Sequence, residues 1–335
     1  MRTDWEKLDW KRLAALRQRF LEAPAGTDYW QSPEDLEVYD ETFAERIGWK
    51  WDAVLGELRL RGWKPASPRL VDWGCGTGIA ARRMLSAFPD AAWERITLWD
   101  RSSMAKAFAA EGVSRTCATA RVVTPFSEAD AFAAFDGAVV LLSHVANELS
   151  PAARDELVNA LSRAAAIVWV EPGTWQHSGM IVEARERLRG SFTVVAPCTH
   201  SNACGMLAEA NRRHWCHHFA HPPTEAFMNA GWTRFGQILG IDLRALPYSF
   251  ICLAAPASGS AQPEGRSRVI GRCIERKGLM EVLACSADGV QILELWERDN
   301  KPVIKLLRKQ PGIPVFRWQS NGPRVAPGAE AISFG

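Results

Sequence analysis

The chain has 335 residues, of which 47% are hydrophobic and 23% charged, and its formal net charge is +2. These values are ordinary for a globular protein with a sizeable core. No apolar run approaches the roughly 18 residues that a membrane helix needs, and the charged N-terminus lacks the apolar segment of a signal peptide. We therefore expect a cytoplasmic protein without a membrane partner, whose eight cysteines are thiols or metal ligands rather than disulfides.

The chain begins with a stretch that is predicted to be helical. Apolar side chains recur there at helical spacing, in two sets: Trp5, Leu8, Leu13, Leu16 and Phe20, then Tyr39, Phe43, Ile47, Trp51, Val54 and Leu58. From Arg69 onward, short apolar runs such as LVDWG, ITLWD, GAVVLLS and AIVWVEPG alternate with helical stretches. Because that alternation requires crossover connections, it predicts an α/β fold with a mainly parallel sheet, which the strand YSFICLAA closes.

The sequence divides into four predicted parts. They are an N-terminal helical region at 1–66, a Rossmann-like domain at 67–257 with a cysteine-rich insertion at 196–222, a linker at 258–267, and a small β-rich domain at 268–335. The linker is inferred from the composition of residues 256–265, PASGSAQPEG. The last part alternates short strands with turn signals at Asp288-Gly289 and Asp299-Asn300, which is typical of a small antiparallel barrel.

A glycine-rich turn, VDWGCGTG at 71–78, leads from an apolar strand into a helical stretch. Glycines are needed there because the turn is tight and a cofactor must approach the backbone closely. The run from Gly76 to Ala81 also fits the dinucleotide pattern, but two carboxylates favour S-adenosylmethionine (SAM). Asp72 would receive the ammonium group of SAM, and Asp100 its ribose hydroxyls. The candidate cofactor-binding residues are Asp72, Gly74, Cys75, Gly76, Gly78, Asp100 and Arg101, with Cys75 as a small filler; an empty or degenerate site is the alternative.

The reaction centre is expected at the carboxyl end of the fourth strand, because ligands bind at such ends in open parallel sheets. The chain there reads SHVANEL at 143–149. Methyl transfer needs a positioned acceptor and sometimes a base. His144 or Glu148 could act as that base, and Asn147 could orient the acceptor. Alternatively, Asn147 and Glu148 cap the following helix and His144 is a packed histidine.

The segment 197–219, PCTHSNACGMLAEANRRHWCHHF, is dense in metal-ligating side chains. Cys198, Cys204 and Cys216 are spaced too irregularly to share one helical face, and thiolates are ligands suited to zinc or iron–sulfur centres. The candidates for a fourth ligand are Cys285, Cys273, Cys252 and a nearby histidine such as His217. Three buried structural thiols are the alternative.

Several of these motifs together resemble one family. VDWGCGTG, LSHVANEL, VWVEPGT, VAPCTH and HWCHHF look like the mitochondrial small-ribosomal-subunit assembly methyltransferase-like proteins and their bacterial relatives. The similarity spans about 69–219 and resumes in LACSADG and KLLRK. Its most specific part is EPGT, followed by APC-x-H and WCH.

The resemblance implies a SAM-type Rossmann fold, a four-cysteine [4Fe–4S] cluster, and association with small-subunit ribosomal RNA or a ribosome assembly intermediate. It also implies that Cys198, Cys204, Cys216 and Cys285 hold the cluster, with Cys273 competing for the fourth place. Our leading hypothesis is a monomeric SAM-dependent methyltransferase that acts on, or helps assemble, the small ribosomal subunit. Two others are a non-catalytic RNA-binding assembly factor and a zinc-containing methyltransferase for a small molecule or protein.

The β-rich domain carries basic side chains that could contact RNA phosphates. They are Arg266, Arg268, Arg272, Arg276, Lys277, Lys301, Lys305, Arg308 and Lys309. Acidic side chains are interleaved with them, which is also typical of an ordinary solvated face: Glu275, Glu281, Asp288, Glu294, Glu297 and Asp299.

Overall fold

The computed structural model of the chain describes residues 4–22, 27–256, 265–309 and 313–334. The chain divides into two compact units. Unit 1 comprises Met1–Gly56, Lys64–Glu171 and Ala220–Leu246, and unit 2 comprises Glu57–Trp63, Pro172–Phe219 and Pro247–Gly335. Residues 258–264 of the predicted linker lie outside the described residues.

The described part of unit 1 contains a parallel sheet with the strand order β3-β2-β1-β4-β5. Its strands are β1 (Arg69–Trp73), β2 (Arg95–Trp99), β3 (Arg121–Val123), β4 (Val139–Ser143) and β5 (Ala166–Pro172). Apart from their end residues, β1, β2, β4 and β5 are buried throughout, as in a parallel sheet covered on both faces. The predicted α/β fold is confirmed. The order reverses between β1 and β4, and ligands bind at the carboxyl ends of strands at such a point.

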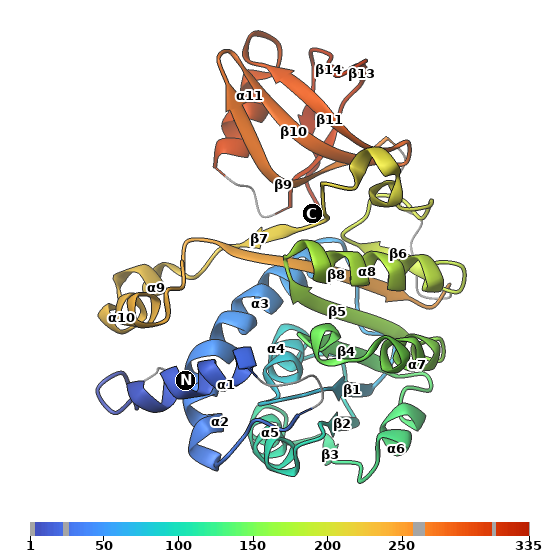
Figure 1. Cartoon of the computed structure of the whole chain (residues 1–335). Helices are drawn as coiled ribbons and strands as arrows, with labels where there is room; N and C mark the ends of the chain where they lie inside the picture. Colours follow the sequence, from blue (N-terminus) through green and yellow to red (C-terminus); the bar gives the residue numbers. More distant parts are fainter. Residues whose placement is uncertain (1–3, 23–26, 257–264, 310–312, 335) are drawn as a thin grey trace. The chain divides into compact units, whose positions relative to one another are not determined.

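Crossover helices flank this sheet (Figure 1). They are α4 (Ile79–Ala87), α5 (Ser103–Thr116), α6 (Glu128–Ala133) and α7 (Pro151–Leu161). Serine side chains accept backbone N–H hydrogen bonds at the start of three of them: Ser102 at α5, Ser127 at α6 and Ser150 at α7. Such caps satisfy donors that the first helical turn leaves unpaired.

The region predicted to be helical contains α1 (Trp10–Glu22), α2 (Pro33–Tyr39), the π-helical turn η1 (Asp40–Ala44) and α3 (Glu45–Leu60). An apolar cluster joins α1, α2 and α5 through Leu16, Trp30, Leu36 and Ala105. Two further helices of unit 1 follow much later in the chain, α9 (Thr224–Met228) and α10 (Ala230–Leu239). None of the helices within the described ranges combines the length and apolarity needed to cross a membrane.

Unit 2 includes the cysteine-rich segment. The segment follows α8 (Trp175–Leu188) and β6 (Thr193–Ala196), and it contains two 3₁₀ turns, η3 (Gly205–Leu207) and η4 (Glu209–Asn211). It leads into β7 (His218–Ala220), which pairs with β8 (Leu246–Ala254), and β8 also pairs antiparallel with β6.

A second sheet occupies the end of the chain, with the order β13-β14-β11-β10-β9-β12-β15. Its strands are β9 (Ser267–Arg276), β10 (Leu279–Ser286), β11 (Gly289–Trp296), β12 (Val315–Arg317), β13 (Ser320–Asn321), β14 (Arg324–Val325) and β15 (Glu330–Ala331). The predicted turn at Asp288-Gly289 joins β10 to β11. At the predicted turn Asp299-Asn300 the chain forms helix α11 (Glu297–Arg308), which is kinked at Asn300, where φ is −133° and ψ is 34°. Val303, Ile304 and Leu307 of that helix have helical spacing and are buried in the core of this sheet.

Candidate functional site

The glycine loop after β1 adopts a backbone conformation that favours glycine at three positions. Gly74, Gly76 and Gly78 have φ values of 72°, 50° and 77°, in the left-handed region. A Cβ atom on Gly74 would lie 2.4 Å from Cγ1 of Val145, so a side chain there would also clash with the loop after β4. The loop is fixed to β2, since the N–H groups of Gly74 and Cys75 both donate to the carbonyl of Trp99.

Two carboxyl groups flank the glycine loop. Asp72 is fully buried; its Oδ2 accepts from the N–H of Ala81 at 3.1 Å, while its Oδ1 is buried without a hydrogen-bond partner. Burial raises the pKa of Asp72 to about 7. Asp100 accepts from the N–H groups of Gly76 at 3.0 Å and Ser102 at 2.9 Å, and burial also raises its pKa. Oδ1 of Asp72 is therefore a buried hydrogen-bond acceptor to which no group donates.

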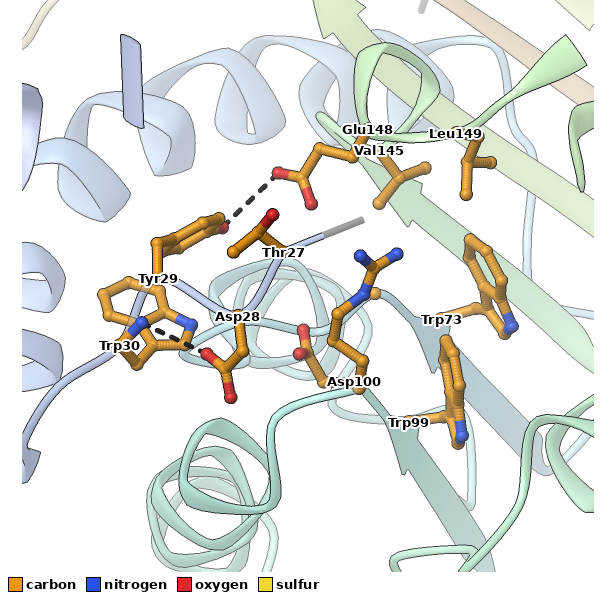
Figure 2. Close-up of a pocket in the computed structure, with 12 residues that line it drawn as sticks. Thr27, Asp28, Tyr29, Trp30, Trp73, Trp99, Asp100, Val145, Glu148 and Leu149 are labelled. Atoms are coloured by element: carbon orange, nitrogen blue, oxygen red, sulfur yellow. Dashed lines mark hydrogen bonds between the residues drawn. The ribbon is translucent and has the colours of Figure 1, made fainter. Parts of the chain in front are cut away.

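A pocket opens at the carboxyl ends of β1, β2 and β4 (Figure 2). It encloses about 410 Å³ of empty space, counted together with its open mouth. Its lining residues are Thr27, Asp28, Tyr29, Trp30, Trp73, Gly74, Trp99, Asp100, Arg101, Val145, Glu148 and Leu149. Among these lining residues, Gly74, Asp100, Arg101 and Glu148 are predicted site residues, whereas the segment 27–30 was not predicted.

The segment 27–30 enters the pocket from the N-terminal helical region and faces the loop after β4. The Tyr29 hydroxyl donates to Oε1 of Glu148 at 3.4 Å, and the Trp30 N–H donates to Oδ1 of Asp28 (Figure 2). Burial raises the pKa of Glu148, and the charge of Asp100 raises it further. Among the described lining residues, Asp28, Asp100 and Glu148 are acidic and Arg101 is basic, so this part of the lining is acidic overall.

The predicted reaction-centre residues lie in different environments. Glu148 lines the pocket, whereas Asn147 is exposed and His144 is half-buried. His144 directly follows β4 and has a φ of 57°, and its N–H donates to the carbonyl of Val170. The alternative in which Asn147 and Glu148 cap the next helix is wrong, because Ser150 occupies the cap position of α7.

Three residues beside His144 were missed as site residues. Nζ of Lys50, on α3, lies 3.4 Å from Nε2 of His144, and the indole N–H of Trp51 donates to Oγ of Ser143. Glu171, at the end of β5, is fully buried. The helical periodicity around Lys50 and Trp51 indicated only a packed face, and nothing in the EPGT motif indicated the direction of the Glu171 side chain.

The unpaired oxygen of Asp72 leads to a prediction about stability. Since the pKa of Asp72 is about 7 in the folded chain and about 3.9 in an unfolded one, its stabilising contribution is full below pH 4 and is lost as the pH rises to 7. Asp72→Asn removes this loss. We subtract the unfolding free energy of wild type from that of Asp72→Asn, both measured by urea denaturation. We expect this difference to be about 2 kcal/mol more positive at pH 8 than at pH 5. Asp130→Asn, at an exposed aspartate, is the control, and equal pH slopes for Asp72→Asn and wild type would contradict the prediction.

The four predicted cluster ligands, Cys198, Cys204, Cys216 and Cys285, are free thiols in unit 2. They are close enough to affect one another's pKa. Burial, followed by the charge of Cys198, raises the pKa of Cys204 to about 11. Burial also raises the pKa of Cys216, with further contributions from Cys198 and Cys204. The pKa of Cys285 is raised by burial and then by the other three thiols.

Cys273 and Cys252, the other candidates for the fourth ligand, differ from Cys285 in what raises their pKa. The pKa of Cys273 is raised by burial and by Glu275, and Cys273 packs against the core of the terminal sheet. The pKa of Cys252 is raised by burial and by Glu57. Neither is influenced by another cysteine. Within the described ranges, no group of three or more His, Cys, Asp or Glu side chains is arranged to hold a single metal ion.

Imidazole and guanidinium groups surround the four thiols. Nε2 of His200 lies 3.6 Å from Sγ of Cys285, and Nε2 of His218 lies 3.9 Å from Sγ of Cys216. Arg185, on α8, is 2% exposed and donates through Nη2 to the carbonyls of His200 at 3.1 Å and Asn202 at 2.9 Å. Burial lowers the pKa of Arg185, but Cys198 and Cys204 outweigh this and raise it, so these thiols lie beside a buried cation.

A second pair of guanidiniums fixes the backbone at the start of the cysteine-rich segment. Arg61 donates to the carbonyls of Val195 and Pro197 at 3.0 Å each, and Arg268 donates to the carbonyl of Pro197 at 3.2 Å. Both arginines share the buried carboxylate of Glu57, at 2.8 Å from Arg61 and 2.5 Å from Arg268. This network holds the backbone that precedes Cys198.

Comparison with solved structures finds methyltransferases, all at low identity. A candidate RNA methyltransferase from Pyrococcus horikoshii has a TM-score of 0.36 and 11% identity, covering 76% of this chain and 98% of its own. The precorrin-6y C5,15-methyltransferase of Geobacter metallireducens has a TM-score of 0.36 and 14% identity, covering 61% and 86%. A SAM-dependent methyltransferase from Thiobacillus denitrificans in complex with S-adenosyl-L-homocysteine has a TM-score of 0.32 and 13% identity, covering 62% and 91%.

No curated protein matches the chain significantly. A family model does match it, over residues 52–294, and its description is "Mitochondrial small ribosomal subunit Rsm22". The matched region is more than half of the 335 residues and includes the glycine loop, the SHVANEL segment and all four thiols discussed above. The chain belongs to the mitochondrial small ribosomal subunit Rsm22 family.

Proposed function

We propose that this chain is a SAM-dependent methyltransferase of the small ribosomal subunit, which either methylates a component of the subunit or assists its assembly. SAM binding is supported by the glycine loop, in which Oδ1 of Asp72 is unpaired, and by the acid-lined pocket beside it. The family description supports the ribosomal half.

The pocket fits a cationic cofactor better than a dinucleotide. The sulfonium and ammonium groups of SAM are positive, and Asp28, Asp100 and Glu148 line the pocket. The pyrophosphate of a dinucleotide would place negative charge among the same carboxylates, which is unfavourable. In the proposed complex Asp72 receives the ammonium group, Asp100 receives the ribose hydroxyls, and the predicted loop residues Gly74, Cys75, Gly76 and Gly78 allow close approach, with Arg101 at the rim.

Calorimetric titration with SAM tests this half of the proposal. We expect Asp100→Asn to bind SAM at least tenfold more weakly than wild type, which corresponds to about 1.4 kcal/mol, because it loses a negative charge and a hydrogen-bond acceptor. Asp130→Asn is the matched control, since Asp130 is exposed and does not line the pocket. No heat from wild type at millimolar SAM, or equal affinities for wild type and Asp100→Asn, would refute the SAM site.

We further propose that Cys198, Cys204, Cys216 and Cys285 hold a [4Fe–4S] cluster. All four residues are free thiols, and four cysteine thiolates are the usual ligands of such a cluster. The pKa of Cys285 is raised by burial and then by the other three thiols, so the four lie near one another. The buried guanidinium of Arg185 would compensate the negative charge of such a cluster. When bound, the cluster would link Cys285 of β10 to the cysteine-rich segment.

Anaerobic purification and metal analysis separate the two metal hypotheses. A brown protein with broad visible absorbance and about four irons per chain supports the cluster. A colourless protein with stoichiometric zinc would replace it with the zinc hypothesis.

The proposed ribosomal partner rests on the family description rather than on the charge of the terminal sheet. Arg268 is buried against Glu57, and two other predicted RNA contacts are paired with carboxylates, Arg276 with Glu281 and Arg308 with Glu275. These pairs favour the solvated-face alternative for this domain. The domain boundaries, the monomeric state and the cytoplasmic location stay predictions, and the family description names the mitochondrion.

A further inference from the structure

A lysine is buried beside the predicted reaction centre. Lys50, on α3, is 8% exposed, and its Nζ lies 3.4 Å from Nε2 of His144. Burial and the nearby cation Arg46 lower the pKa of Lys50 to about 7, although the charge of Glu171 opposes this. A buried charged lysine is costly unless it is paired and hydrogen-bonded, and the partner of Nζ here is an imidazole rather than a carboxylate.

The contact between Lys50 and His144 constrains where protons can lie. Two nitrogens at hydrogen-bond distance cannot both donate to each other, so one holds the proton and the other presents a lone pair. A second proton on the pair would place two cations about 3.4 Å apart in a buried site, which is strongly unfavourable. The two side chains can therefore bind one proton beyond their neutral forms, shared between Nζ and Nε2, but not two.

A buried carboxyl group completes the cluster. Oε1 of Glu171 accepts from the N–H groups of Val145 at 3.0 Å and Ala146 at 2.9 Å, and from the indole N–H of Trp169 at 2.8 Å. Its Oε2 is buried without a partner, and burial raises the pKa of Glu171 to about 7. Glu171 thus fixes the backbone immediately after His144, where Val145 lines the pocket.

We propose that Lys50, His144 and Glu171 form a proton-transfer site at the carboxyl ends of β4 and β5, in which Lys50 and Glu171 position His144 and set its protonation state. This inference rests on the proposed function, because it assigns the site to the acceptor side of methyl transfer. Its substrate class is an acceptor that loses an N–H or O–H proton on methylation.

The step balances without a further reactant. Methyl transfer forms a bond between the acceptor atom and the methyl carbon of SAM, while the C–S bond breaks and leaves its electron pair on sulfur. The proton of the acceptor passes to the imidazole of His144, and Nε2 of His144 can pass a proton to the neutral amine of Lys50. Because the pair holds one proton, it must start this step with that proton released to solvent.

Nuclear magnetic resonance of the full chain tests the shared proton. In chain labelled with ¹³C-histidine, the ring signal of His144 is assigned by its loss in His144→Gln. We expect Lys50→Met to lower the titration midpoint of His144 by at least about one pH unit, because the imidazolium then loses the neutral amine that accepts its hydrogen bond and shares its proton. Lys106→Met, in the same unit, is the matched control and should leave the midpoint unchanged. An unchanged midpoint in folded Lys50→Met overturns the inference.

A second measurement needs no variant that could fail to fold. In wild type labelled with ¹³C-lysine, one Cε signal should titrate near neutral pH with the midpoint seen for His144, whereas ordinary lysines titrate near about 10.4. If every lysine titrates at the ordinary value, the inference is wrong.

Transfer of tritiated methyl groups from SAM to purified small ribosomal subunits tests the catalytic role. Lys50→Met should transfer at least tenfold more slowly at pH 7, with a shifted pH profile, while binding SAM with wild-type affinity. A wild-type rate and profile in Lys50→Met would overturn the role. Absence of SAM binding by wild type would instead refute the proposed function, and the resonance titrations would still decide whether the proton is shared.

Discussion

Replacing Cys216 by serine is expected to abolish iron binding and to lower the melting temperature of the purified chain sharply. Cys216 is half-buried beside the other thiols, and the pKa of its thiol is raised by burial and then by Cys198 and Cys204. Its backbone is held in place, because its carbonyl accepts from the hydroxyls of Ser178 at 2.8 Å and Ser249 at 2.7 Å. A hydroxyl is a poor iron ligand, and the free energy of metal binding is also free energy of folding. Iron content, visible absorbance and thermal unfolding measure the effect.

Two other cysteine variants make this experiment specific. Cys285→Ser should lose iron as Cys216→Ser does, whereas Cys273→Ser should keep it, since Cys273 packs against the terminal core rather than beside the other thiols. All three substitutions exchange sulfur for oxygen, so they differ only in position. Full iron in Cys285→Ser together with iron loss in Cys273→Ser would show that the fourth ligand is Cys273.

Glu57→Gln is expected to destabilise the chain by about 3–5 kcal/mol, as breaking a buried ion pair does. The carboxylate of Glu57 lies between Arg61 and Arg268, and the substitution leaves two buried guanidiniums without their anion. Burial raises the pKa of Glu57, but the two arginines outweigh this and lower it. A carboxyl whose pKa is lowered by folding stabilises above its unfolded pKa of about 4.3, and this stability is lost as the pH falls.

Urea denaturation at neutral and acidic pH measures this effect. The difference between Glu57→Gln and wild type should shrink as the pH falls below about 4, because wild type then loses the same charge. Glu281→Gln is the control, since Glu281 pairs with Arg276 at the surface, where such pairs contribute at most about 1 kcal/mol. A loss of less than about 1 kcal/mol in Glu57→Gln would show that water or another anion compensates the two arginines.

The parts of the fold that local sequence determines were predictable. The strand before Asp72 and the strand before Asp100 are apolar runs bounded by turn residues, and both carboxyl groups lie beside the glycine loop as their positions suggested. Helix α11 was not predicted, because the Asp299-Asn300 pair indicated a turn; the backbone does leave helical geometry at Asn300, but the helix continues beyond it.

The missed site residues depend on tertiary contacts between distant segments. Tyr29 reaches Glu148 across 119 positions, and Lys50 reaches His144 across 94. Neither residue belongs to a motif, so only the folded chain reveals them. Glu171 does belong to a quoted motif, but its position in the sequence does not tell whether its carboxyl group is buried or exposed.

The acidic lining of the pocket bears on product release. Methyl transfer converts a positively charged sulfonium into a neutral thioether, so the attraction exerted by Asp28, Asp100 and Glu148 weakens at the moment the reaction is complete. In the proposed enzyme S-adenosyl-L-homocysteine would therefore dissociate faster than SAM. Added salt would reduce the difference between the two dissociation rates. The same carboxylates that retain the methyl donor would in this way favour turnover.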